Sequence, residues 1–276
     1  MIQTEKIQDK TNSPSSEVSD TRVVIDGKRH YICNGVPKPL PSVTTILSAT
    51  SSAEQQRKLA AWNRLNPGAA DHAAERGTWI HNAVENYLCG INVIPPNSFE
   101  PYWKGMPERL DGLLDGGRVL WSERPFNIPR WNKYVGDDGV GRIHYYDHTT
   151  GYGYAGCCDL IYMDKNAEVV LADFKTSNGP YASKFPSKNA DVEPKVKKAL
   201  ISGVFKCKKT RIQLAAYKMA AEECLGIKIS KTQIIVSTAV EGFSTQVFTF
   251  GPNEIEKDQD TWWALVSKYY DSMTSA

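Results

Sequence analysis

Short apolar runs separated by turn-forming clusters are the clearest pattern in the second half of this 276-residue chain. Residues 156–161 and 170–175 are two such runs, and the polar cluster Asp164-Lys165-Asn166 lies between them. Because Asp and Asn favour tight turns, this pattern predicts a hairpin of two strands. Residues 233–239 and 245–250 predict a second pair of strands nearer the C-terminus.

Elsewhere, apolar residues recur at the helical spacing of three to four, which predicts helices at residues 43–48, 53–65, 77–88, 210–225 and 252–273. Near the N-terminus, residues 22–25 and 29–33 predict a hairpin around Asp26-Gly27-Lys28. Together these elements predict an α/β fold with a central mixed β-sheet flanked by helices on both faces. We expect a disordered polar tail at residues 1–20, then one domain over residues 21–276 with insertions near 129–152 and 181–210.

The central hairpin brings acidic side chains together. Folding it about Lys165-Asn166 places Asp159 opposite Asp173 or one position away, and Lys175 leaves the same strand face as Asp173. Paired carboxylates repel each other and lose hydration unless a cation lies between them, and Mg²⁺ and Mn²⁺ prefer oxygen ligands. The alternative is a solvated strand edge on which Asp159 is only a turn residue.

Two of the predicted helices carry polar pairs spaced by one turn. His81 and Glu85 share a face of residues 77–88, beside the apolar stripe. A histidine there can complete the coordination of a carboxylate-bound metal, although a core or capping histidine is the commoner case. Gln213 and Tyr217 are likewise four residues apart, and on their own they indicate an ordinary amphipathic helix with a buried tyrosine.

In this order, the motifs resemble one family. They are Gly77-Thr78-x-x-His81-x-x-x-Glu85, Gly156-x-x-Asp159, Asp173-Phe174-Lys175-Thr176-Ser177 and Gln213-x-x-x-Tyr217. The set resembles the PD-(D/E)XK nuclease superfamily in its RecB-like exonuclease branch, over roughly residues 40 to 220. The resemblance implies a restriction-endonuclease-like core and a metal-dependent deoxyribonuclease.

The resemblance also implies a role for each matching residue. His81, Asp159, Asp173 and the backbone carbonyl of Phe174 would hold Mg²⁺ or Mn²⁺, and Lys175 would polarise the attacking water. Gln213 and Tyr217 would brace the site or the DNA backbone. Glu123 lies where many relatives carry an acidic residue on the first core strand, so it is a candidate for a supporting role or a second metal. The candidate catalytic residues are therefore Asp159, Asp173, Lys175, Glu123, Gln213 and Tyr217.

Basic residues are concentrated between residues 184 and 211, although the net charge of the chain is only +2. Because this segment lies between two of the motifs, we expect it to guide a phosphate backbone, with a solvated face as the alternative. Tyr181 and Phe185 interleave with it and are candidates for stacking on unpaired bases. The candidate substrate-binding residues are Lys184, Lys195, Lys197, Lys198, Arg211 and Tyr217.

The remaining features restrict the class of protein. The six cysteines lack the closely spaced late trio with which some RecB-like relatives hold an iron–sulfur cluster, so no cluster is expected. No secretory signal or membrane-length apolar run is visible, which favours a cytoplasmic protein of a bacterium or a phage-infected cell and no membrane partner.

We therefore expect an exonuclease that acts on single-stranded DNA or free DNA ends in replication, recombination or repair, with proteins of those pathways as partners. The alternatives are a double-strand-specific recombination exonuclease or endonuclease of the same superfamily, and a non-catalytic nucleic-acid-binding protein.

Overall fold

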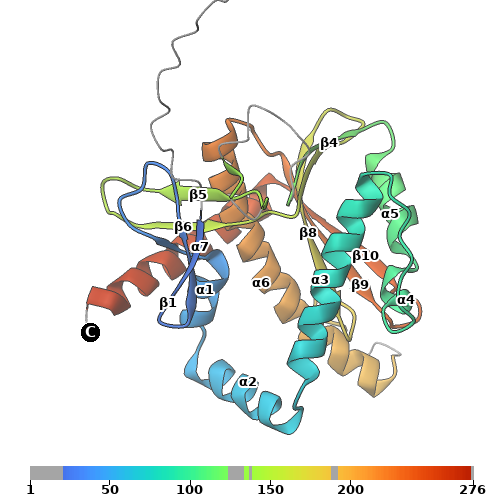
Figure 1. The fold of residues 1–276 in the computed structure, drawn as a ribbon. Helices are drawn as coiled ribbons and strands as arrows, with labels where there is room; N and C mark the ends of the chain where they lie inside the picture. The colour runs from blue at the N-terminus through green and yellow to red at the C-terminus, as the bar shows by residue number, and fades with distance from the viewer. Residues whose placement is uncertain (1–20, 124–133, 137–138, 188–191, 275–276) are drawn as a thin grey trace, which may run out of the picture.

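A five-stranded mixed sheet lies at the centre of the molecule (Figure 1). The structure is a computed structural model that describes residues 21–123, 134–136, 139–187 and 192–274. The sheet has the order β10-β9-β8-β7-β4, in which β8 and β9 are parallel and the other neighbours are antiparallel. Its strands are β4 (Arg118–Ser122), β7 (Leu160–Met163), β8 (Val169–Ser177), β9 (Lys231–Thr238) and β10 (Thr245–Phe250). The prediction of an α/β fold with a mixed sheet is confirmed.

The β7–β8 hairpin forms where the sequence predicts it. Its turn is closed by the Asp164 carboxylate, whose Oδ1 accepts hydrogen bonds from the backbone N–H groups of Asn166 at 2.9 Å and Glu168 at 3.0 Å. This Asx-type closure is the reason that Asp and Asn favour such turns. Leu160 pairs with Ala172, so continuing the register by one residue sets Asp159 opposite Asp173.

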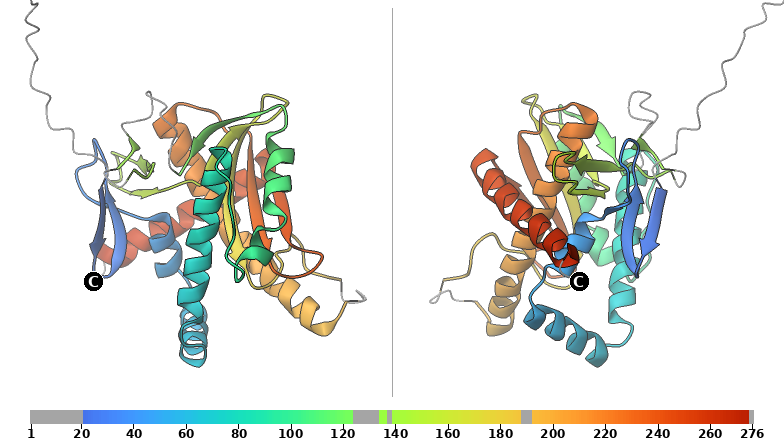
Figure 2. Two further views of the ribbon diagram at one scale, coloured as in Figure 1. Left: turned by 45° about the vertical axis from the view of Figure 1, so that its right-hand side comes forward. Right: turned by 90° about the vertical axis from the view of Figure 1, so that its left-hand side faces the viewer.

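Helices cover both faces of the sheet because successive side chains of each strand point to opposite sides. Val170, Ala172 and Phe174 of β8 pack under α3 (Ala69–Leu88), α4 (Glu100–Trp103) and α5 (Met106–Leu114). Leu171 points the other way. It packs with α1 (Val43–Ala49), α6 (Pro194–Leu225) and α7 (Pro252–Thr274). Figure 2 shows the two layers from the side.

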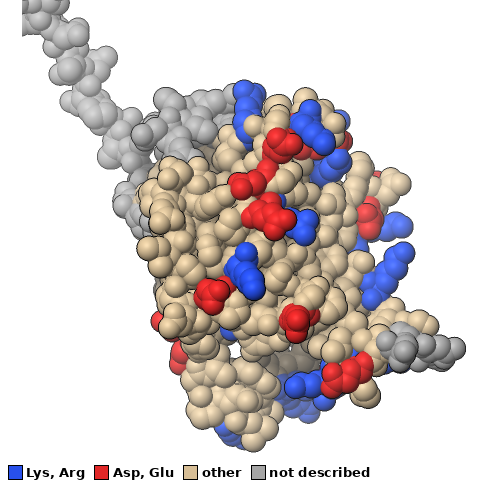
Figure 3. Space-filling view, turned by 90° about the vertical axis from the view of Figure 1, so that its right-hand side faces the viewer, with Lys and Arg blue, Asp and Glu red and all other residues tan. Residues whose placement is uncertain are grey.

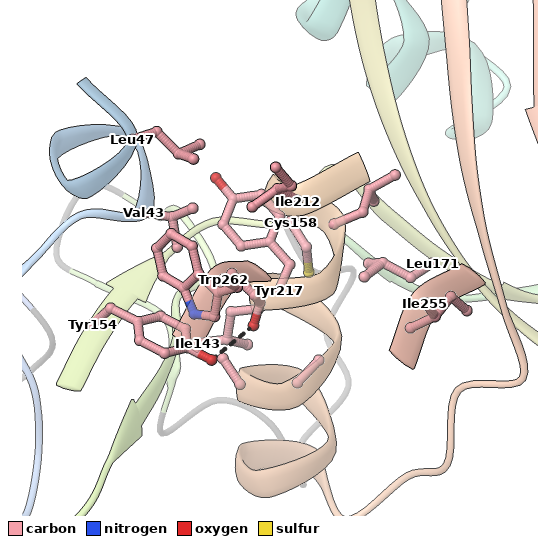
Figure 4. Close-up of a cluster of buried hydrophobic side chains, with 14 of the residues drawn as sticks. Val43, Leu47, Ile143, Tyr154, Cys158, Leu171, Ile212, Tyr217, Ile255 and Trp262 are labelled. Atoms are coloured by element: carbon pink, nitrogen blue, oxygen red, sulfur yellow. Dashed lines mark hydrogen bonds between the residues drawn. The ribbon is translucent and has the colours of Figure 1, made fainter. Parts of the chain in front are cut away.

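The second of these layers holds the larger buried cluster (Figure 4). Val43 of α1, Trp262 of α7 and Tyr154 of β6 (Gly153–Gly156) meet Tyr217 of α6 there. The Tyr154 hydroxyl donates to the Ala216 carbonyl at 3.2 Å, which satisfies its polar end inside the cluster. Each such side chain contributes on the order of 1.5–3 kcal/mol by leaving water, so this cluster fixes α6 and α7 against the sheet.

Two small sheets complete the structure. The first contains β1 (Thr21–Ile25), β2 (Lys28–Ile32) and β3 (Leu40–Pro41), and the second contains β5 (Ile143–Tyr146) and β6. Ile25 pairs with Lys28, because Asp26 and Gly27 both take positive φ and close a two-residue turn. Lys28 therefore belongs to the strand, not to the turn as predicted.

Two predicted helix starts are wrong, and one prediction falls outside the described residues. Helix α3 begins at Ala69, so Gly77 lies inside it, and α6 begins at Pro194, so residues 194–210 extend the Gln213 helix. Lys, a good helix former, supplies six of the 17 residues of this extension, which is consistent with the expected insertion near 181–210 being largely helical. The described part of the other insertion, near 129–152, contributes β5. Residues 1–20, and with them the expected tail, lie outside the described residues.

Helix α2 (Ala53–Leu65) differs from the other long helices, because it has no buried residue. A capping box starts it, with Ser52 and Gln55 bonding each other's backbone N–H groups. It connects α1 to α3 at the bottom of the view in Figure 1. Among the described residues, no helix combines the length and the apolar character that crossing a membrane requires.

Candidate metal centre

Side chains from four separate segments converge at the open end of the β7–β8 hairpin, away from its turn. His81 comes from the middle of α3, Glu123 directly follows β4, Asp159 directly precedes β7, and Asp173 lies in β8. Helix α3 is held over β8 by packing that includes an edge-to-face contact between the rings of His81 and Phe174, with centroids 6.3 Å apart. The sheet and one helix therefore position the site.

His81, Glu123 and Asp159 form a compact cluster of potential metal ligands. The Nδ1 atom of His81 is 3.3 Å from Oε2 of Glu123 and 3.6 Å from Oδ1 of Asp159. One ligand atom from each residue lies within 4.8 Å of the other two. One imidazole nitrogen and two carboxylate oxygens are a donor set that suits Mg²⁺ or Mn²⁺.

The backbone of Phe174 orients two members of this cluster. Its N–H donates to Oδ2 of Asp159 at 2.7 Å, which leaves Oδ1 directed at His81. Its carbonyl accepts from Nε2 of His81 at 3.1 Å. Such outer hydrogen bonds fix the orientation of a ligand and the tautomer of a histidine. The Phe174 carbonyl was expected to bind the metal itself, but in this structure it contacts the histidine.

Asp173 makes a different set of contacts from those expected of a metal ligand. Its carboxylate forms an ion pair with Lys175, and its Oδ1 accepts from Nε2 of Gln213 at 3.2 Å. Nε2 of Gln213 also lies 3.1 Å from the Tyr217 hydroxyl, which accepts from it. In this structure the compact cluster thus contains Glu123, which was expected only in a supporting role, whereas Asp173 contacts Lys175 and Gln213; the expectation that Asp173 binds the metal stays a prediction.

The proximity of these charges shifts their pKa values. Burial alone would lower the pKa of His81, but the Asp159 and Glu123 carboxylates outweigh it and raise the pKa to about 9. Burial raises the pKa of Asp159 to about 7, because His81 offsets only part of the desolvation and Asp173 adds to it. Burial opposes the charge of Lys175, yet Asp173 and Asp159 raise its pKa. The two carboxylates thus favour the protonated form of His81, and the charges of His81 and Lys175 both favour the ionised form of Asp159.

Tyr217 cannot contact a substrate, because it is buried inside the α6 cluster. Its ring packs so closely on Gly156 that a Cβ atom there would lie 2.5 Å from Cε1 of Tyr217. Burial, followed by the charges of Asp173 and Asp159, raises the pKa of the Tyr217 hydroxyl. The substrate-binding role expected for Tyr217 is therefore corrected to support of Gln213.

Arg211 also differs from expectation. Its Nε donates to Oδ2 of Asp258 on α7 at 2.8 Å, and its guanidinium lies 4.5 Å from the ring centroid of Phe250. The side chain thus joins α6 to α7 and β10. Of the other expected phosphate contacts, Lys184, Lys195 and Lys198 are exposed and Lys197 is half-buried. Tyr181 is buried, so its expected stacking on bases is also corrected.

A cavity of about 320 Å³ lies beside Lys175 and Gln213. Lys206 and Lys209 form its basic wall, and no carboxylate is among the residues that line it, which are Thr44, Leu47, Lys175, Tyr181, Lys206, Lys209, Thr210 and Gln213. Nζ of Lys206 donates to Oγ of Ser177 at 2.9 Å. Burial, assisted by the Arg76 guanidinium, lowers the pKa of Lys206.

Neither Lys206 nor Lys209 was among the predicted site residues, and nor was Thr44. The signal for the two lysines was present, since residues 206, 209, 210 and 213 follow the helical spacing and share the face of α6 that carries Gln213. Recognising this signal requires the predicted helix to begin before residue 210. A larger hollow of about 940 Å³ lies between α1, α2 and α7, and its lining includes none of the cluster residues.

No family model matches the chain, and no curated protein matches it. The functional argument for this protein therefore depends on the site itself.

Proposed function

We propose that this protein is a metal-dependent deoxyribonuclease that hydrolyses phosphodiester bonds on a restriction-endonuclease-like core, as a member of the RecB-like branch of the PD-(D/E)XK superfamily. The observation that carries the proposal is the convergence of His81, Glu123 and Asp159 next to the Asp173–Lys175 ion pair. These residues come from segments up to 94 positions apart in the sequence (175 minus 81). A structural ion pair alone does not require such a concentration of carboxylates, since each unpaired one costs desolvation energy.

The residues divide into three tasks. A bound divalent cation would neutralise charge on the phosphodiester and lower the pKa of a water molecule. His81, Glu123 and Asp159 would hold it, and the Phe174 N–H would keep Asp159 in the required orientation. Lys175, held by Asp173, lines the cavity and is placed to hydrogen-bond a water molecule or a phosphate oxygen there.

The substrate we propose is single-stranded DNA or a free DNA end, cleaved as an exonuclease. The support is electrostatic. The cavity beside Lys175 is lined by three lysines and no carboxylate, so it favours a polyanion. Its volume of about 320 Å³ suits a small part of a strand, such as one nucleotide, more than a duplex. Replication, recombination or repair in the cytoplasm is the context in which such an activity would act.

The test is cleavage of labelled single- and double-stranded oligonucleotides, each blocked at the 5′ end, the 3′ end or both. We expect cleavage with Mg²⁺ or Mn²⁺, none in excess chelator, and protection by one blocked end. Cleavage of doubly blocked substrates would instead indicate an endonuclease, and preference for duplex would indicate a recombination exonuclease. Binding without cleavage under every metal condition would leave a non-catalytic binder.

Variants assign the activity to this site. Asp159→Asn and Glu123→Gln should each lower the rate by about 10²-fold or more, because each removes a charged ligand while keeping side-chain size. Glu256→Gln on the exposed face of α7 is the matched control and should retain the wild-type rate. Equal rates for Asp159→Asn and Glu256→Gln would overturn the proposal.

A further inference from the structure

Two phenylalanines form an exposed aromatic pair on the surface beside α6. Phe185 and Phe205 are 59% and 60% exposed, yet their rings contact each other edge to face, with centroids 5.6 Å apart. Neither belongs to a buried cluster of the described residues. Large aromatic rings held together in water gain little from folding, so this arrangement suggests a surface that binds something.

The pair rests on a rigid support. Gly203 of α6 is buried against residues 180 and 181, and a Cβ atom there would lie 2.3 Å from the Pro180 carbonyl oxygen. Tyr181 is tied to β10 as well, since its N–H donates to Gln246 Oε1 at 2.9 Å and its carbonyl accepts from Gln246 Nε2 at 3.1 Å. Phe185 follows four residues later. The segment that leads to Phe185 is therefore held by α6 on one side and by β10 on the other.

The part of α6 that carries Phe205 has charges of one sign. From Pro194 to Arg211, helix α6 carries seven basic residues and no acidic residue. Lys198, Ser202, Phe205 and Lys209 follow the i, i+4, i+7 and i+11 spacing, so they form one stripe along the helix. Lys209 also lines the cavity beside Lys175. By contrast, basic and acidic side chains are interspersed on the face shown in Figure 3.

We propose that Phe185 and Phe205 are a stacking platform for unpaired bases of a DNA strand whose phosphates contact Lys198 and Lys209. A positive groove combined with exposed aromatic rings is the usual way to bind single strands without sequence preference. A duplex hides the faces of its bases, so the platform selects single-stranded DNA. The inference deepens the proposed function: the platform would direct a strand toward the Lys175 cavity, but binding of bases by it does not require cleavage.

The test compares two ligands that differ only in their bases. Affinities are measured in excess chelator for a 12-mer of thymidine and for an abasic backbone of the same length. We expect wild type to prefer the thymidine strand by at least tenfold, since each stacked base contributes substantially to binding. Phe185→Ala/Phe205→Ala should bring the ratio of the two affinities close to one.

Control variants distinguish base stacking from the effect of charge and from the removal of any exposed apolar side chain. Phe205→Trp should keep the preference for bases. Leu65→Ala, which alters a side chain that is 79% exposed on α2, should leave both affinities unchanged. Lys198→Gln/Lys209→Gln should weaken both ligands alike and make the salt dependence shallower by about 1.4, or about 0.7 for each lost phosphate contact. Thermal melting of each variant checks that folding is intact.

The outcomes distinguish this inference from the proposed function. An unchanged ratio in the double phenylalanine variant would overturn the platform, even if metal-dependent cleavage is observed. In a second outcome, the double variant loses the preference for the thymidine strand while wild type cleaves no DNA under any metal condition. That combination would support the platform and refute the nuclease. Equal affinity of wild type for the two ligands would also refute the platform and leave the aromatic pair as a contact surface for a protein.

Discussion

Replacing Arg211 by methionine distinguishes a residue that holds the fold together from one that holds DNA. The structure joins its guanidinium to Asp258 of α7 and to the ring of Phe250. Methionine keeps the apolar stem and removes the charge, so the carboxylate of Asp258 loses its partner. We expect Arg211→Met to lower the free energy of unfolding and to leave DNA affinity at wild-type level when measured on folded protein.

The magnitude follows from the burial of the pair. Breaking a fully buried ion pair costs about 3–5 kcal/mol, and a hydrogen bond to a charged group contributes about 1.5–3 kcal/mol. The side chains of Arg211 and Asp258 are 21% and 10% exposed, so the lower range applies, at about 2 kcal/mol. Loss of the contact with Phe250 adds about 0.5 kcal/mol. The total of about 2.5 kcal/mol corresponds to a decrease in Tm of roughly 5–10 °C.

Urea unfolding of Arg211→Met, Asp258→Asn and the double variant measures the coupling between the two residues. We expect about 1–2 kcal/mol of coupling, because the double variant no longer buries an unpaired charge. Burial raises the pKa of Asp258 and Arg211 lowers it, so the variant should hold a proton there to higher pH. The destabilisation should therefore decrease as the pH falls through the raised pKa of Asp258, where the carboxyl group becomes neutral.

Lys195→Met is the matched control, since Lys195 is an exposed basic residue at the start of α6. It should change the free energy of unfolding by less than about 0.5 kcal/mol. The reasoning would be refuted if Arg211→Met unfolded like wild type while its DNA affinity and salt dependence fell. Arg211 would then be a phosphate contact, as the sequence alone suggests.

Three further predictions concern the site and its surroundings. Metal affinity should rise between pH 7 and pH 9, because bound metal displaces protons from His81 and Asp159, whose pKa values are about 9 and about 7. Calorimetry in buffers of different ionisation enthalpy should detect the released protons. A metal affinity that does not change with pH would contradict the proposed ligand set. Gly156→Ala should cost about 1–3 kcal/mol in urea unfolding, since its Cβ would meet the Tyr217 ring at 2.5 Å, whereas Gly112→Ala, with no heavy atom within 4 Å, should not destabilise. Neutralising Lys195, Lys197 and Lys198 together should weaken binding of all DNA sequences alike and make the salt dependence shallower by about 2; an unchanged slope would show that these lysines only face solvent.

The hairpin could be predicted from the sequence because its determinants are local. The Asp164 turn and the two apolar runs set the register, and the register alone places Asp159 opposite Asp173. The position of Glu123 in the ligand cluster, by contrast, does not depend on neighbouring residues in the sequence. It depends on the pairing of β4 with β7, in which the register shifts between Val119 and Trp121, and nothing in the sequence near Glu123 specifies that shift.

The basic segment shows how a charge pattern can hide a helix. Residues 196, 199, 200, 203, 204 and 207 are apolar or small and follow the helical period, but the lysines between them suggested an insertion that guides a phosphate backbone. The roles of Arg211 and Tyr217 could not be predicted for another reason. Their partners Asp258 and Gly156 lie 47 and 61 residues away, and only tertiary packing brings them together.

The hydrogen bonds of Phe174 make the geometry of the candidate metal centre depend on strand alignment. The N–H of Phe174 donates to Asp159 and its carbonyl accepts from His81. Sliding β8 along β7 by one residue would break both bonds and turn the side chain of residue 173 to the opposite face of the sheet. The geometry of the ligand cluster therefore depends on one alignment of the two strands. Any insertion or deletion in the turn from Asp164 to Glu168 that shifted this alignment would separate His81, Asp159 and the Phe174 backbone, even though the turn lies at the other end of the hairpin.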